Sequence, residues 1–277
     1  MKKLSLLLLP LILFSCTEKE QTITFLDTSV TLFYDGSKQL SVIYSSDELK
    51  SKAYTYTSSD STIVTVSKTG LVKGVSIGTA TVKVASTDGK YSGACSLTIS
   101  PKSTLYNEPY TVFGSTISTV KSKETRKINS ETTTSLIYTD TDTDVRYILY
   151  SFGNGKLTGS SILLTQTTSI ATEVTTFLLE RYRYLGFSSP YYIFTDRKSG
   201  NGIGLTVDAN LGLCVLYIPP TSTSSVQMQK LRNSMNQIPT MNNSNKAFSI
   251  ELQKAMSPVF PDISLKNKEK VMLVVGL

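Results

Sequence analysis

Three aspartates that alternate with threonines form the clearest pattern of possible metal ligands in the sequence. Asp140, Asp142 and Asp144 have the spacing of the first ligands of a calcium-binding loop. Such a loop also needs glycine at its sixth position and a bidentate glutamate at its twelfth, where this sequence has Val145 and Ser151. A solvated hairpin loop is therefore the favoured interpretation over a metal site, and we expect no cofactor.

The sequence contains no histidine, which excludes Ser-His-Asp and Cys-His catalysis and most zinc sites. Carboxylates remain as possible acids and bases, and Glu173, Glu180 and Arg181 fall in a segment with helical spacing. We interpret these three as surface charges rather than as an acid–base pair. We therefore predict no catalytic residues and a protein that is not an enzyme; a carboxylate-dependent glycan hydrolase is the alternative.

Four tyrosines, Tyr182, Tyr184, Tyr191 and Tyr192, lie close together in the sequence. A tyrosine ring offers an apolar face and a polar hydroxyl, which suits contact with a sugar or with another protein. We predict that these residues form a binding face. A core whose hydroxyl groups reach the surface explains the same pattern and stays open.

The tyrosines lie in a stretch, residues 105–220, in which each helical pattern precedes three strand patterns. The hydrophobic periodicity predicts helices at 114–123 and 169–185, the second ending at Gly186, and strands at 135–139, 145–152, 156–164, 191–195, 203–207 and 213–218. This order predicts an α+β domain with helices on an antiparallel sheet, and an internal duplication is possible.

Two motifs in this stretch carry a resemblance. Gly114-Ser115 followed by Val120-Lys121, and a run from Tyr147 to Leu157 with Tyr150, Phe152 and Asn154-Gly155, resemble the β-lactamase-inhibitor-like proteins of bacterial envelopes. The resemblance implies a domain that binds other proteins.

Residues 21–100 contain short strand patterns separated by turns such as Asp35-Gly36 and Asp88-Gly89. Seven or eight strands at this spacing predict a β-sandwich. The Ser58-Ser59-Asp60 turn, the strand at 63–66 and the glycine-containing strands at 70–75 and 78–82 resemble the bacterial Ig-like group 2 family, with Tyr56 where that family commonly has tryptophan. The resemblance implies an adhesion module or a spacer.

The N-terminus carries Lys2 and Lys3, an apolar run at 4–14, then Ser15 and Cys16. The run is too short to cross a bilayer and reads as a signal peptide of residues 1–15. A small residue before a single cysteine resembles the lipobox of bacterial lipoproteins. That resemblance implies acylation of Cys16, whose acyl chains would anchor the protein in a membrane.

Residues 16–20 form the expected tether. Thr17 after the cysteine, and the charged residues that follow, resemble Gram-negative outer-membrane lipoproteins and the surface-export signal of Bacteroidetes lipoproteins. Formal net charge is +7, and loss of Lys2 and Lys3 leaves +5. The lysines are scattered, so we expect no nucleic-acid partner. Cys95 and Cys214 are expected to be buried free thiols rather than a disulfide.

Residues 221–277 read as a mixed helical tail without an assigned role. We therefore predict a lipid-anchored protein of the outer membrane, at the cell surface, in which an Ig-like spacer or adhesion module presents a protein- or glycan-binding domain. A purely structural accessory lipoprotein is the remaining alternative.

Overall fold

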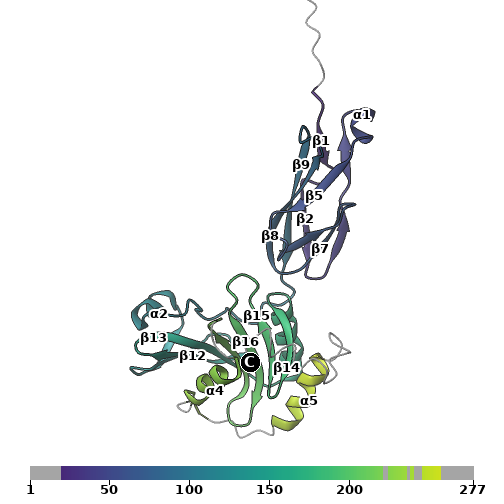
Figure 1. Ribbon diagram of the computed structural model, residues 1–277. Coiled ribbons are helices and arrows are strands. Elements are labelled where there is room, and N and C mark those ends of the chain that lie inside the picture. The colour runs from purple at the N-terminus through teal and green to yellow at the C-terminus, as the bar shows by residue number, and fades with distance from the viewer. Residues whose placement is uncertain (1–19, 221–223, 236–237, 240–244, 257–277) are drawn as a thin grey trace, which may run out of the picture.

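The computed structural model describes residues 20–220, 224–235, 238–239 and 245–256. Figure 1 shows two domains placed end to end, an elongated N-terminal domain and a broader second domain that contains the longer helices. The protein is mainly β, as predicted.

The N-terminal domain is a β-sandwich. One sheet has the order β2-β9-β8-β5 and the other β3-β7-β6, while β1 and β4 form a separate pair. Its strands and single helical turn are β1 (Ile23–Phe25), β2 (Ser29–Phe33), β3 (Ser37–Gln39), β4 (Val42–Tyr44), α1 (Asp47–Lys50), β5 (Tyr54–Ser58), β6 (Val64–Val66), β7 (Leu71–Gly74), β8 (Gly78–Ser86) and β9 (Ser92–Ser100).

Strict alternation along β8 and β9 turns Val82, Val84 and Leu97 into a fully buried core between the sheets. Tyr56 packs against this core, with its ring centroid 6.3 Å from that of Phe25. Tyr56 therefore supplies an aromatic side chain to the core at the position where the bacterial Ig-like group 2 family commonly has tryptophan.

The second domain contains one eight-stranded antiparallel sheet of order β10-β11-β12-β13-β17-β16-β15-β14. Its elements are α2 (Ile117–Lys123), β10 (Lys127–Glu131), β11 (Ser135–Thr139), β12 (Val145–Gly153), β13 (Lys156–Leu164), α3 (Thr168–Leu179), β14 (Arg183–Ser188), β15 (Tyr191–Thr195), β16 (Gly202–Asp208), β17 (Gly212–Ile218), α4 (Ser224–Asn233) and α5 (Asn245–Met256).

This sheet is built from two copies of one unit, a helix followed by four strands, that meet where β13 pairs with β17. From the C-terminal end of the helix through the first hairpin, each residue of the first copy is equivalent to the residue 56 positions later in the second copy. Residues 137–140 read Ile-Tyr-Thr-Asp and residues 193–196 read Ile-Phe-Thr-Asp. Glu124 and Glu180 occupy the same C-cap position after α2 and α3. The possible duplication is thus a structural repeat, with four strands in each copy instead of the predicted three.

The prediction of a helix over 169–185 is wrong at its C-terminal end. Helix α3 ends at Leu179, and the chain enters β14 at Arg183, which pairs with Thr195 of β15. Helical spacing does not reveal this end, because Tyr182 packs into the same core as Val174 and Phe177 although it lies outside the helix.

Both faces of the sheet are covered. Helices α3 and α5 lie over one face together with Leu105 and Tyr106 of the interdomain segment. Helix α4 lies over the other face, where Met228 and Leu231 are buried.

Two glycines in the sheet set how closely α4 approaches. A Cβ atom at Gly204 of β16 would lie 2.4 Å from the Met228 sulfur, and one at Gly159 of β13 would lie 2.9 Å from Leu231 Cδ1. Any larger side chain there would push the helix away. The two glycines therefore allow α4 to pack closely on the sheet at this position.

The two domains are joined through Glu180, whose side chain is fully buried. Its carboxylate accepts hydrogen bonds from the Lys102 N–H at 2.7 Å and the Ser103 N–H at 3.1 Å, and it pairs with Arg181 at 2.6 Å. Its backbone carbonyl accepts from the Ile77 N–H of the N-terminal domain at 2.9 Å. The interpretation of Glu180 as a surface charge is therefore wrong. At the C-cap of α3 its carboxylate is buried and binds the segment that connects the two domains.

Candidate functional site

The structure separates the four tyrosines of the predicted binding face: Tyr184 and Tyr192 line one pocket, whereas Tyr182 and Tyr191 are buried in two different cores. Tyr182 is buried beside Tyr217, with 6.3 Å between ring centroids, and its hydroxyl donates to Glu108. Tyr191 is buried on the α4 side of the sheet. Tyr184 and Tyr192 are half-buried on the opposite side and line one pocket. The alternation of β15 explains the split of Tyr191 from Tyr192.

A β-bulge brings a further aromatic residue, Phe187, to the same pocket. Tyr184 pairs with Phe194 and Phe187 pairs with Tyr192, and the register shifts between them because Leu185 is an extra residue. Residues three apart in a regular strand point to opposite faces, whereas the bulge puts Tyr184 and Phe187 on one face. Sequence periodicity does not show a bulge, so Phe187 was not among the predicted residues.

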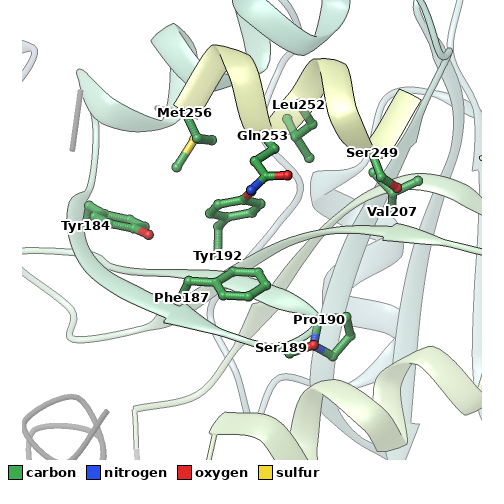
Figure 2. Close-up of a pocket in the computed structure, with 10 residues that line it drawn as sticks. All are labelled: Tyr184, Phe187, Ser189, Pro190, Tyr192, Val207, Ser249, Leu252, Gln253 and Met256. Carbon is green, nitrogen blue, oxygen red and sulfur yellow. The ribbon is translucent and has the colours of Figure 1, made fainter. Parts of the chain in front are cut away.

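The pocket has a volume of about 420 Å³ and lies between α5 and the outer strands β14 to β16 (Figure 2). The rings of Phe187 and Tyr192 are 4.8 Å apart and tilted by 51°, and Tyr184 meets Phe194 edge-on at 5.1 Å. Phe187 is 43% exposed, so part of its apolar ring is accessible from solvent. The lining consists of Tyr184, Phe187, Ser189, Pro190, Tyr192, Val207, Ser249, Leu252, Gln253 and Met256.

The lining carries polar groups but no residue that is charged at neutral pH. Burial raises the pKa of both Tyr184 and Tyr192 above its ordinary value of 10.0, so their hydroxyls stay protonated and neutral. Figure 2 shows Gln253 extending from α5 toward Tyr192. The pocket thus combines aromatic faces with an amide and hydroxyl groups, a lining suited to an uncharged ligand with polar edges.

A second cavity, of about 880 Å³, lies in the first repeat near the end of α2, the start of β10 and the end of β11, and its lining includes carboxylates. Arg126 binds two of them, Glu124 at 2.9 Å and Asp140 at 2.7 Å. Burial opposes ionisation of Asp140, but hydrogen bonds from the Asp142 backbone and from Arg126 outweigh it and lower its pKa. Glu108 also lines this cavity; desolvation of its carboxyl group, which accepts from Tyr182, raises its pKa even though the residue is exposed overall.

The side chains of two of the three alternating aspartates bind the local backbone. Asp140 accepts a hydrogen bond from the Asp142 N–H at 3.1 Å, and Asp142 accepts one from the Asp144 N–H at 2.9 Å. These are Asx turns, which shape a loop. Within the described residues, no three potential ligands converge on one point.

Cys95 and Cys214 are free thiols in separate cores, as predicted. Burial raises the pKa of both thiols, so they stay protonated at neutral pH. Cys16, the predicted lipid attachment, lies outside the described residues. None of the helices in the described part of the chain combines the length and the apolar character needed to cross a bilayer.

Comparison with solved structures finds weak likenesses. The chain is similar to an intimin mutant of EHEC O157:H7, with 17% identity over 29% of this chain and 44% of that chain and a TM-score of 0.21. It is also similar to surface layer protein SbsC, domains 1–6, with 16% identity over 70% of this chain and 31% of that chain and a TM-score of 0.24. In each case the match spans less than half of the solved chain.

The curated proteins contain no match to this chain. A family model matches the N-terminal domain only. Residues 21–97 match the bacterial Ig-like domain (group 2), which confirms the prediction made from the Ser58-Ser59-Asp60 turn and the strands that follow it.

Proposed function

We propose that this protein is a lipid-anchored binding protein of the bacterial cell surface whose second domain binds an uncharged saccharide in the aromatic pocket. The observation that carries the proposal is the placement of Tyr184, Phe187 and Tyr192 around one partly open cavity without charged residues. The Ig-like domain serves as the spacer, and acylated Cys16 serves as the anchor in the outer membrane.

The chemistry of the pocket favours a sugar ring. One face of a pyranose is lined by C–H groups that pack on aromatic rings, and its edge carries hydroxyls that need hydrogen-bond partners. Tyr184, Tyr192 and Gln253 offer such partners beside the rings. A volume of about 420 Å³ lies within the common range for small-molecule sites, roughly 300–1,000 Å³.

The decisive experiment is a glycan array and a pull-down with the full chain, wild type and Phe187→Ala. Phe187 is 43% exposed, so its truncation should leave the fold intact and weaken binding at least about tenfold, as loss of a central aromatic contact does. Ile128→Ala is the matched control, because Ile128 is 41% exposed on β10 at the position equivalent to Tyr184. It should leave binding unchanged.

Two results would count against the proposal. Capture of a protein partner without any glycan would favour a protein-binding domain, and binding to neither would favour a structural accessory lipoprotein. The anchor is tested separately, since Cys16→Ser should release the protein from membranes and continued retention would refute lipidation.

A second candidate function is glycan hydrolysis in the carboxylate cavity. One observation favours it: the environments of Glu108 and Asp140 push their pKa values in opposite directions, as in an acid and its partner carboxylate. Against it, Arg126 already neutralises Asp140 and Glu124. Release of reducing ends from a glycan by wild type, abolished in Glu108→Gln, would establish hydrolysis.

A further inference from the structure

The sheet face under α4 contains a groove of small residues. A Cβ atom at Gly159 of β13 or at Gly204 of β16 would collide with a side chain of α4. Ser161 lies on the same face, because it is two residues beyond Gly159 on β13 and pairs with Leu216 of the core on the α4 side. Small residues on a sheet let another backbone approach closely, so this groove is shaped to receive a helix.

Two hydroxyl groups on this face are buried without a hydrogen-bond partner among the residues that the structure describes, those of Ser161 and Tyr191. Ser161 is fully buried and Tyr191 is 2% exposed. A buried polar group without a partner costs free energy. The described part of α4 therefore fills the groove but leaves two of its polar groups unsatisfied.

The opposite face of the same strand is complete. Ser160 is as fully buried as Ser161, and its hydroxyl donates to the Tyr110 carbonyl at 2.8 Å. Tyr217, which pairs with Ser160 in the sheet, shares a hydrogen bond with the Tyr106 hydroxyl at 2.8 Å. Neighbouring serines on one strand thus differ in hydrogen bonding because they face different helices.

The contacts of α4 define what the groove accepts. Met228 and Leu231 supply an apolar stripe against the two glycines. Arg232 pairs with Asp208 of β16, which is only 7% exposed. A buried carboxylate at the groove needs a cation. The groove therefore suits an amphipathic helix that carries one lysine or arginine beside its apolar stripe.

We propose that the sheet face under α4 is a binding groove for an amphipathic helix of a partner protein, and that α4 occupies it as an intramolecular substitute. The partner helix has an apolar stripe, a cation that reaches Asp208, and a polar side chain that bonds Ser161 or Tyr191. These added hydrogen bonds favour the partner over α4. The groove lies on the other side of the sheet from the aromatic pocket, so this proposal does not depend on the saccharide site.

Cys214 reports whether α4 leaves the sheet, because its thiol is buried in the core that α4 covers. In the full chain with Cys16→Ser and Cys95→Ser it is the one remaining thiol. We expect a thiol reagent to label it through a local opening whose rate changes little with urea. Tyr191→Phe and Ser161→Ala remove the unsatisfied hydroxyls, favour the docked state, and should each slow labelling at least about threefold.

Ser160→Ala is the matched control, because it removes an equally buried hydroxyl that is bonded on the opposite face. It should not slow the labelling of Cys214. Labelling that depends on urea as steeply as global unfolding, or that is slowed by neither Tyr191→Phe nor Ser161→Ala, would make α4 a permanent part of the core and overturn the proposal. Labelling that slows as protein concentration rises would assign the groove to α4 of a second copy and overturn the assignment to a different partner.

A synthetic peptide of residues 224–238 tests the groove itself. In the full chain with Met228→Asp and Leu231→Asp, α4 should no longer dock, and the peptide should protect Cys214 from labelling at least about tenfold. The wild-type chain, whose groove is filled, should bind the peptide much more weakly. The paired substitutions Met228→Ala and Leu231→Ala serve the same purpose if the charged variant fails to fold.

A peptide with Arg232→Gln is the comparison for the cation, since it lacks the partner of Asp208. It should bind the variant chain at least about fivefold more weakly than the unchanged peptide. Equal binding of the two peptides, or no protection of Cys214 by either, would overturn the proposal.

Discussion

The two repeats of the second domain share one backbone but differ in what they expose. Both β10 and β14 carry a bulge at the same position, at Asn129 and Leu185. The side chains that the bulge brings to one face are Ile128 and Glu131 in the first repeat and Tyr184 and Phe187 in the second. The shared bulge sets the geometry of this edge, the residue types at two positions set its aromatic character, and α5 completes the pocket over the second repeat.

The C-cap glutamates, Glu124 and Glu180, also occupy one backbone position but have different roles in the two repeats. Glu124 takes part in an ion network within its own repeat, whereas Glu180 accepts the backbone of the interdomain segment. One structural position thus closes a cavity in the first repeat and joins two domains in the second. The following changes test how far this difference extends.

Glu180→Ala should have the largest effect. It removes the acceptor of the Lys102 and Ser103 N–H groups and the carboxylate that pairs with Arg181. We expect the free energy of unfolding to fall by about 3–5 kcal/mol, measured by urea denaturation. Small-angle scattering should show that the domains are no longer held end to end. Glu124→Ala is the comparison in the first repeat and should leave the interdomain geometry unchanged; loosening by both variants alike would contradict the assignment.

Gly159→Val should come next. Its side chain would collide with Leu231, so we expect a loss of about 1–3 kcal/mol from overpacking, read from the urea midpoint. The double variant with Leu231→Ala should recover part of this loss. Full stability of Gly159→Val alone would show that α4 does not pack with Leu231 against Gly159.

Alkaline pH tests whether the buried tyrosines of the two repeats behave alike. In the second repeat Tyr217 is fully buried and bonded to Tyr106, and burial holds the pKa of its hydroxyl well above 10.0. A pKa raised in the folded state means that its stabilising contribution is complete below the unfolded pKa and is lost as pH rises above it.

Between pH 10 and 11 each such tyrosine should lower the free energy of unfolding by about 1 kcal/mol, and at higher pH by up to about 1.4 kcal/mol per pH unit. Tyr217→Phe should therefore lose less stability than wild type between pH 10 and 11, as measured by denaturation at each pH. Tyr150→Phe should behave similarly, because burial also raises the pKa of Tyr150. Identical pH dependence of variants and wild type would show that these hydroxyls ionise as freely when folded.

The helix caps should show the smallest effect and no difference between the repeats. Thr116 accepts the Thr119 N–H and Thr167 accepts the Ile170 N–H, each at 3.2 Å. Thr116→Ala and Thr167→Ala should each cost about 1 kcal/mol, measured by thermal unfolding. A cost confined to one helix would mean that the two helices are not stabilised in the same way.

Much of the fold was accessible from the sequence, because strands with one buried face alternate visibly, as in β8 and β9. The two strands that the sequence did not predict, β10 and β14, form the two edges of the eight-stranded sheet. β10 (Lys127–Glu131) is mostly exposed and polar, and β14 continues the helical spacing of α3. Neither strand buries enough apolar surface on one face to leave a clear periodic signal.

The candidate site was only partly accessible. Clustering in the sequence identified Tyr184 and Tyr192, but strand alternation and the bulge decide which neighbours join them. Phe187 and the residues of α5 enter the pocket through tertiary contacts that no local pattern records. The burial of Glu180 was hidden for a similar reason, since its partners Lys102 and Ser103 are far away in the sequence.

The attachment at Glu180 also determines how the molecule would carry tension. A pull between the N-terminus and a ligand held at β14 enters the second domain where Lys102 and Ser103 meet the end of α3. Helix α3 is packed along the sheet through Val174, Phe177 and Leu178. Part of the load would therefore pass through these hydrogen bonds into the packed helix, and the rest would follow the covalent chain through α2 to the edge strand β10.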